Sequence, residues 1–187
     1  MSSKIGVQNI AHTNGTNAMT VSSGGVVTFN NAPVNVGGIL QTVVNGTINE
    51  SQHSSNQGTW ANTNYTLAIT PSATSSKISV HFHFPFALKT TGTKLRGSLR
   101  LNRTIASTTT LIWNTGSYEE QFHGRDSGGT PDEMNYVANM TFLDSPNTTS
   151  ATTYTVQMLI KADSGASYAF SHRSAYGGAI ILTEVAG

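Results

Sequence analysis

Two histidines separated by one residue, His81 and His83, have the spacing of a metal-binding pair. In an extended strand, side chains two residues apart point to the same face and lie about 7 Å apart along the chain. Such a pair can chelate a transition metal, and His123 or His172 could supply a further ligand. Histidines on strands are more often polar surface or interface residues. We therefore predict no metal and no cofactor, with His81 and His83 as the candidate ligands if a metal were bound.

A glycine-rich segment occurs at Arg125-Asp126-Ser127-Gly128-Gly129-Thr130-Pro131. It is similar to the nucleophile loop of trypsin-like proteases, Gly-Asp-Ser-Gly-Gly-Pro, but the chemistry does not fit. In that family a glycine two residues before the serine supplies an N–H group to the oxyanion hole, and Arg125 occupies this place. His53 lacks the family's Ala-Ala-His setting, and no aspartate in a family motif would orient it. We interpret the segment as a surface loop and reject a protease.

Carboxylates and aromatic residues gather between residues 116 and 136. A glycosidase needs two facing carboxyl groups at a set separation, and closeness along a loop does not provide this for Glu119, Glu120, Asp132 and Glu133. Aromatic side chains beside polar residues could instead form a surface that stacks on sugars or docks to a protein. The residues of this candidate receptor-facing loop are Tyr118, Phe122, Arg125, Asp126 and Asp132. Tyr136, which flanks the loop, is expected in the core.

Few residues of the chain are charged, and this limits the classes of partner that the sequence favours. Charged residues make up 10% of the 187 residues, against an average near 25%. The net charge of +1 gives no electrostatic attraction to nucleic acid or to an anionic membrane. No apolar run approaches the roughly 20 residues of a membrane helix, and the absence of cysteine excludes disulfides and zinc–thiolate sites. Residues 1–6 lack the apolar core of a signal peptide, so we expect synthesis in a cytoplasm.

The clearest structural signal is strict alternation between Lys77 and Phe84, after a Pro/Ser/Thr-rich turn at residues 70–76. One face of this segment carries Ile78, Val80, Phe82 and Phe84, and the other carries Ser79, His81 and His83. This pattern indicates a half-buried strand. The same plan follows the turn at residues 145–152, with Tyr154, Val156, Met158 and Ile160 on one face. We predict that both segments are central strands of one β core.

Further segments with strand patterns predict an all-β protein. We expect strands at residues 39–44, 65–69, 97–103, 110–113, 136–143, 168–171 and 179–185, and a loop over residues 116–132. In the strand at 97–103, Leu99 and Leu101 should face the core. About eight or nine strands with turn signals at roughly 8–15-residue intervals are typical of a sandwich or barrel. Since a jelly roll has eight strands in two packed sheets, we predict an antiparallel, jelly-roll-like β-sandwich over residues 37–187.

Residues 1–36 differ in character from the rest of the chain. Their apolar residues come in twos and threes, separated by turn signals such as Asn14-Gly15 and Ser23-Gly24-Gly25. Strands this short cannot bury a core alone. We therefore predict a short-stranded N-terminal segment that is ordered by neighbouring chains and serves attachment and oligomerisation. The residues expected to bind the partner are Ile5, Val7, Ile10, Val21, Val27 and Phe29.

Several stretches of the chain resemble small structural proteins of tailed bacteriophages. They are Lys4–Ile10, Gly15–Val21, Gly25–Phe29, Thr70–Ile78 and Asp144–Val156, and the likeness extends over most of the chain. The similar proteins are tail-fibre-like and head-decoration proteins of phages that infect cyanobacteria and marine bacteria. The resemblance implies a homotrimer with an N-terminal anchoring segment and a β-rich outer domain, and it implies no catalytic residues. The shortness of this chain relative to tail fibres favours a capsid decoration or cement protein.

Three functions are compatible with these features. The first is a non-enzymatic protein of the virion surface, a homotrimer that binds the major capsid protein or tail components through residues 1–36. The second is a tail-fibre tip or lectin-like module that binds carbohydrate on the host surface. The third is a polysaccharide-degrading enzyme, which would need catalytic carboxylates clustered on adjacent strands, and the sequence suggests no such cluster. We predict the first function, with synthesis in the host cytoplasm and without enzyme activity, nucleic-acid binding or membrane insertion.

Overall fold

The computed structural model describes residues 9–11, 17–25, 27–29, 38–46, 48–49, 52–54, 59–90, 94–114, 122–125, 132–162, 167–170 and 177–187. The chain divides into two compact units, Met1–Gly38 and Ile39–Gly187. Among the described residues every regular element is a β-strand. In that part of the chain no helix is long and apolar enough to cross a membrane.

The first unit contains a small antiparallel sheet of three short strands. They are β1 (Asn9–Ala11), β2 (Asn17–Val21) and β3 (Val27–Phe29), with β2 in the centre. The turn between β2 and β3 is closed by the N–H of Gly25, which donates to the carbonyl of Ser22 at 2.9 Å. Gly25 has a φ of +78°, which glycine adopts without steric cost. The predicted turn at Ser23-Gly24-Gly25 is confirmed.

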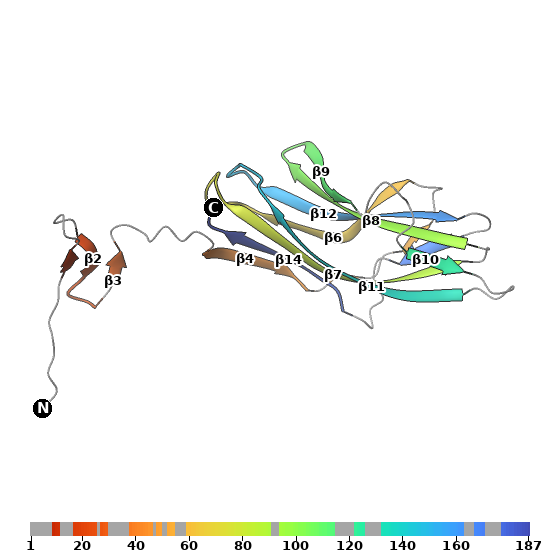
Figure 1. The fold of residues 1–187 in the computed structure, drawn as a ribbon, viewed down its shortest axis with the longest axis horizontal. Helices are drawn as coiled ribbons and strands as arrows, with labels where there is room; N and C mark the ends of the chain where they lie inside the picture. The colour runs from red at the N-terminus through yellow and green to blue at the C-terminus, as the bar shows by residue number, and fades with distance from the viewer. Residues whose placement is uncertain are drawn as a thin grey trace, which may run out of the picture. The chain divides into compact units, whose positions relative to one another are not determined.

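The second unit is a sandwich of two antiparallel sheets, visible as two layers in Figure 1. One sheet has the order β4 (Ile39–Asn45), β14 (Ala179–Val185), β7 (Lys77–Thr90) and β11 (Asp132–Asp144). The other has the order β6 (Trp60–Ile69), β12 (Thr152–Ala162), β8 (Lys94–Ile105) and β9 (Thr108–Asn114). Three short strands extend these sheets. In the first sheet β13 (Ser167–Phe170) lies between β7 and β5 (Gln52–Ser54). In the second sheet β10 (Phe122–Arg125) pairs with β8.

The order of the long strands is that of a jelly roll. When they are numbered 1 to 8 along the chain, one sheet reads 1-8-3-6 and the other reads 2-7-4-5. The first and last strands are therefore neighbours, and Ile39 of β4 lies opposite Val185 of β14. This arrangement of eight strands in two packed sheets confirms the predicted antiparallel, jelly-roll-like β-sandwich.

The core between the sheets is formed by the residues that the alternation placed inward. All eight are at most 3% exposed, namely Ile78, Val80, Phe82, Phe84, Tyr154, Val156, Met158 and Ile160. Leu99 and Leu101 are buried as well. Aromatic rings continue the contact along the core, with Tyr65 edge-on to Phe84 at 4.4 Å and Phe84 at 5.3 Å from Phe86, measured between ring centroids. These side chains supply the apolar burial that stabilises the sandwich.

Strand β7 is longer than predicted, since it runs to Thr90 and not to Phe84. The alternation ends at Pro85, and proline is unusual inside a central strand because it lacks an N–H donor. The structure accommodates Pro85 where the neighbour of β7 changes. Strand β14 pairs with β7 up to His83, and β13 pairs with it from Ala87 onward. The N–H that Pro85 lacks is therefore not needed on the side of β7 that pairs with β14 and β13, because the hydrogen-bonded ladder is interrupted there.

Candidate interaction face

The candidate functional surface is the face of the β4-β14-β7-β11 sheet that points away from the core, and we call it the outer face. Its residues alternate along each strand with buried residues. It consists of Thr42 and Val44 from β4, Ala179, Ile181 and Thr183 from β14, Ser79, His81 and His83 from β7, and Val137, Asn139, Thr141 and Leu143 from β11. The predicted outward positions on β7 are thereby confirmed, and their side chains are half-buried.

The outer face is apolar in part, and the twelve residues named above include no lysine, arginine, aspartate or glutamate; the exposed Lys77 stands beyond them at the start of β7. Strand register sets Val44, Ile181, His81 and Thr141 in one row and Thr42, Thr183, Ser79 and Leu143 in the next. Large apolar side chains project from it, since Val44, Val137 and Leu143 are each 55% exposed. Such a surface can be buried against protein without leaving a charge unpaired. Exposed apolar patches of this kind mark interaction sites when they are large.

The opposite face of the sandwich, on the β6-β12-β8-β9 sheet, has a different chemistry. Its polar side chains bind one another across the strands. The Nε of Arg100 donates to Oε1 of Gln157 at 2.6 Å, and Nε2 of Gln157 donates to Oδ1 of Asn62. The guanidinium of Arg100 also lies 4.4 Å from the ring centroid of Trp60, a cation–π geometry. This network offers a partner less apolar area than the outer face does.

The two histidines of the metal hypothesis are paired with β11 on the outer face. The Nδ1 of His81 lies 2.9 Å from Oγ1 of Thr141, and the Nδ1 of His83 lies 2.6 Å from Oδ1 of Asn139. Each pair consists of residues directly opposite in the ladder. Among the described residues no three histidine or carboxylate side chains are grouped so that they could hold a metal ion. Of the other two histidines considered, His123 lies in β10 of the second sheet, and His172 is outside the described residues.

The residues predicted to bind a partner lie in the first unit. Four of them fall in its small sheet, Ile10 in β1, Val21 in β2, and Val27 and Phe29 in β3. Val21 is half-buried and lies opposite Val27. Ile5 and Val7 are outside the described residues. The structure thus brings four of the six into one sheet, and their role in binding stays a prediction.

The predicted loop over residues 116–132 contains a strand, β10, and this corrects the interpretation of the whole stretch as a loop. Phe122 begins β10, and its ring packs against Phe86 and Tyr136 at centroid distances of 4.8 and 5.5 Å. Phe122 and Tyr136 are therefore half-buried and packed against the core. The role of Phe122 in a receptor-facing surface stays a prediction. Of the other residues of the candidate receptor-facing loop, Arg125 is the last residue of β10 and lies opposite Lys94, and Asp132 is the first residue of β11 and lies opposite Thr90. Tyr118 and Asp126 lie outside the described residues.

Two buried carboxylates link strands and turns of the sandwich, and the first is Glu184 on β14. Its Oε1 accepts hydrogen bonds from the backbone N–H and the hydroxyl of Ser72, both at 2.6 Å, in the turn between β6 and β7. Its Oε2 accepts a hydrogen bond from Nε2 of Gln41 on β4 at 2.5 Å. Burial by itself opposes ionisation of Glu184, but these hydrogen bonds outweigh it and lower the pKa to about 2.

Replacement of Glu184 by glutamine should change how the stability of the protein depends on pH. A pKa lowered from the ordinary 4.5 to about 2 corresponds to a stabilisation of up to about 3 kcal/mol. This contribution is complete above about pH 4.5 and is lost as the pH falls through about 2. Urea denaturation should therefore show the deficit of Glu184→Gln to be largest near neutral pH and to shrink in acid. A deficit that is independent of pH would contradict this assignment.

The second buried carboxylate, Asp144 at the end of β11, joins the two sheets. Both of its oxygens accept hydrogen bonds from Nη1 of Arg103 on β8, each at 2.9 Å. Its Oδ2 also accepts a hydrogen bond from the hydroxyl of Tyr154 on β12 at 2.8 Å. Burial and the hydrogen bond to Asp144 raise the pKa of Tyr154. The cluster is structural, because the Asp144 carboxylate, Nη1 of Arg103 and the hydroxyl of Tyr154 are engaged in holding β11 against the other sheet.

The sequence contained a signal for both of these carboxylates. Glu184 follows Ile180 and Leu182 at two-residue spacing, which makes it an inward position of its strand. A carboxylate at a core-facing position needs hydrogen-bond partners. Asp144 follows Met140 and Phe142 at the same spacing, so it too is at an inward position of its strand. Its partners could not be predicted, because they come from two other strands whose register the sequence does not reveal.

Comparisons with known proteins complete the description of the fold. No protein-family profile and no curated protein matches the chain. Among solved structures, the VP2 subviral particle of infectious bursal disease virus is similar over 76% of this chain, with 8% identity and a TM-score of 0.43. The Gt strain of the same virus is similar over 78%, with 12% identity and a TM-score of 0.38. The matches cover 31% and 37% of those chains, so this chain spans about a third of their length.

Proposed function

We propose that this protein is a non-enzymatic structural component of the surface of a tailed-phage virion. In this proposal it is a homotrimer that attaches through residues 1–36 to other virion proteins, as a capsid decoration or cement protein or as a short fibre. The observation that carries the proposal is the outer face, which exposes Val44, Val137 and Leu143 and whose twelve residues include none with a permanent charge. Three such faces can meet around a symmetry axis without burial of an unpaired charge.

The fold and the sequence resemblance support this choice. Jelly rolls occur among viral capsid domains and lectin domains, so the architecture is compatible with a virion protein without selecting it. The stretches that resemble phage structural proteins lie both in the first unit, at Lys4–Ile10 and Gly25–Phe29, and in turn-and-strand segments of the sandwich, at Thr70–Ile78 and Asp144–Val156. They favour a virion component over a free-standing lectin.

The oligomeric state tests the role of the outer face. Light scattering of the purified protein should give three times the mass of 19.8 kDa. The Val44→Lys variant introduces a charge into the outer face on the edge strand β4, and it should reduce the mass to that of one chain. Ala68→Lys is the matched control, because Ala68 is also exposed on an edge strand, β6, but lies on the polar face of the other sheet. A monomeric unmodified protein, or a trimer that survives Val44→Lys, would count against the proposal.

The first unit is proposed as the attachment segment on energetic grounds. Its described strands are three to five residues long. Ordering a backbone costs about 1–2 kcal/mol per residue, and strands this short can offset that cost only by burying apolar residues against another chain. Backbone pairing with the sheet edge of a partner would add affinity.

Removal of the first unit should separate attachment from folding. A chain that begins at Gly37 should fold with a Tm near that of the full chain, because Ile39–Gly187 is a compact unit with its own core. It should lose the ability to bind phage particles that lack the protein. The proposal fails if the shortened chain binds such particles as well as the intact chain, or if it cannot fold.

A further inference from the structure

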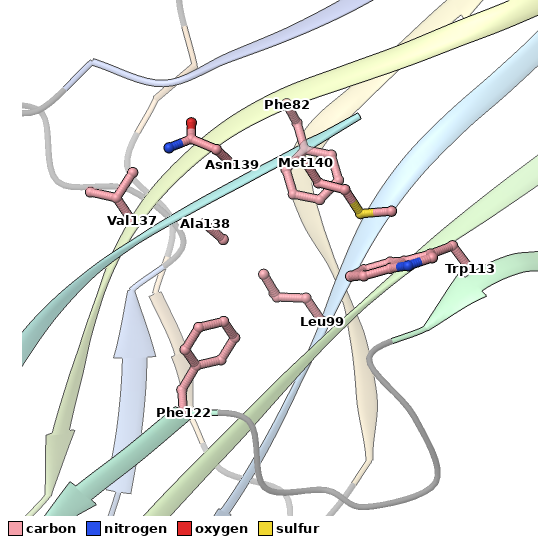
Figure 2. Close-up of a pocket in the computed structure, with 8 residues that line it drawn as sticks. All are labelled: Phe82, Leu99, Trp113, Phe122, Val137, Ala138, Asn139 and Met140. Atoms are coloured by element: carbon pink, nitrogen blue, oxygen red, sulfur yellow. The ribbon is translucent and has the colours of Figure 1, made fainter. Parts of the chain in front are cut away.

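A pocket of about 270 Å³ lies between the sheets at the side of the sandwich formed by β11, β9 and β10. Both sheets contribute to its lining, with Phe82 from β7 and Val137–Met140 from β11 on one side, and Leu99, Trp113 and Phe122 from β8, β9 and β10 on the other. Figure 2 shows Phe82, Leu99, Trp113, Phe122, Ala138 and Met140 directed toward a common space. The side chains of Val137 and Asn139 point away from it.

The lining excludes charged and strongly polar ligands. None of the residues that line the pocket is ionisable. Its polar side-chain groups are the indole N–H of Trp113 and the amide of Asn139, whose Oδ1 is paired with Nδ1 of His83 on the outer face. A charged ligand would lose its hydration without gaining a partner. A water molecule needs two to four polar partners to occupy a cavity stably, and apolar cavities instead remain dry and take up apolar guests.

The shape and the side chains favour an aromatic guest. Phe82 and Trp113 stand edge to face, with their rings inclined by 65° and their centroids 6.5 Å apart. Phe122 presents a further ring, and Met140 contributes a thioether. Aromatic rings prefer such edge-on or offset neighbours, and methionine sulfur makes favourable contacts with them. The volume lies just below the range of roughly 300–1,000 Å³ that is common for ligand pockets, which suits one ring or two fused rings.

We propose that this pocket is a binding site for a neutral aromatic molecule of one or two fused rings. None of the side chains directed into it belongs to the outer face or to the first unit, so the proposal does not depend on the proposed virion role. The ligand enters between the two sheets, and its rings contact Phe82, Trp113 and Phe122. Ala138 is the smallest side chain directed into the space and sets the room that is left for the ligand.

Indole is a suitable probe, and methyl-labelled methionine provides the signal. Titration with indole should shift the Met140 methyl resonance, identified by its loss in Met140→Leu, along a saturable curve. Ala138→Leu fills the pocket and should weaken this binding roughly tenfold or more, since single methylene changes in apolar pockets already alter affinity by about tenfold. Leu143→Thr is the matched control, because Leu143 lies on the same strand, is 55% exposed and does not line the pocket. It should leave the affinity unchanged.

A second measurement locates the ligand without any substitution. Indole bound to the unmodified protein should give nuclear Overhauser contacts to the Met140 methyl group and to the ring of Trp113. This result decides the question even if Ala138→Leu does not fold. The proposal is overturned if binding does not saturate, if these contacts are absent, or if a folded Ala138→Leu variant binds indole as tightly as the unmodified protein.

Discussion

Phe82→Ala is expected to lower the free energy of unfolding by about 3–5 kcal/mol. Phe82 is 1% exposed in the middle of β7 and contacts Trp113 of the other sheet. Truncation would leave a cavity between two sheets whose backbones are fixed by hydrogen-bonded ladders on both sides of β7. Because the site can collapse only in part, both the lost transfer free energy and the cavity contribute. Urea denaturation of the two proteins measures the difference.

Ser79→Ala is the control for this prediction. Ser79 is on the same strand but on the outer face, where it is half-buried. Substitutions of this kind normally change stability by about 0.5 kcal/mol or less. Equal losses for Phe82→Ala and Ser79→Ala would show that both faces of β7 contribute equally to the core of the purified protein, contrary to the arrangement of the sandwich.

Asp144→Ala should be the most damaging change to a polar residue, with a loss of about 3–5 kcal/mol. The side chains of Asp144 and Arg103 are only 8% and 17% exposed. Removal of the carboxylate leaves the guanidinium of Arg103 and the hydroxyl of Tyr154 without the acceptor that both now use. The loss of stability therefore comes chiefly from two buried donors that are left without an acceptor, and less from the lost attraction between Asp144 and Arg103.

The double variant Asp144→Ala with Arg103→Met separates these contributions. It removes the unpaired guanidinium of Arg103 together with the carboxylate of Asp144, so part of the lost stability should return. Chemical denaturation of the two single variants and the double variant gives the coupling energy. If the losses of the two single variants simply add, the ion pair is not the source of the effect.

The sequence predicted those parts of the fold in which one strand alone carries the information. Alternation between Ile78 and Phe84 places apolar residues two positions apart, and this period persists whatever the neighbouring strands are. The second half of β7 was missed because Pro85 interrupts the pattern. Strand β10 was missed because His123-Gly124-Arg125 has no apolar alternation, and its pairing with β8 alone makes it a strand.

Of the residues on the outer face, the sequence predicted only those on β7. The alternation that buries Phe82 also places His81 and His83 on the opposite face. The exposure of Val44 and Leu143 could not be predicted, because it depends on which strands flank β7 and in which register. The aromatic pocket depends likewise on contacts between sheets, since Phe122 and Met140 lie on strands of different sheets and both line it.

The pairing of Ile39 with Val185 makes the sandwich a candidate for circular permutation. A short linker from the end of β14 to the start of β4 would join strands that are already neighbours. New ends could be opened between Ala106 and Ser107, which are exposed in the turn from β8 to β9. Ala106 has a φ of +51°, a conformation unfavourable for a residue with a Cβ atom, so cutting there would release a constrained turn. Fused sequences could then be displayed from that hairpin while every strand keeps its neighbours.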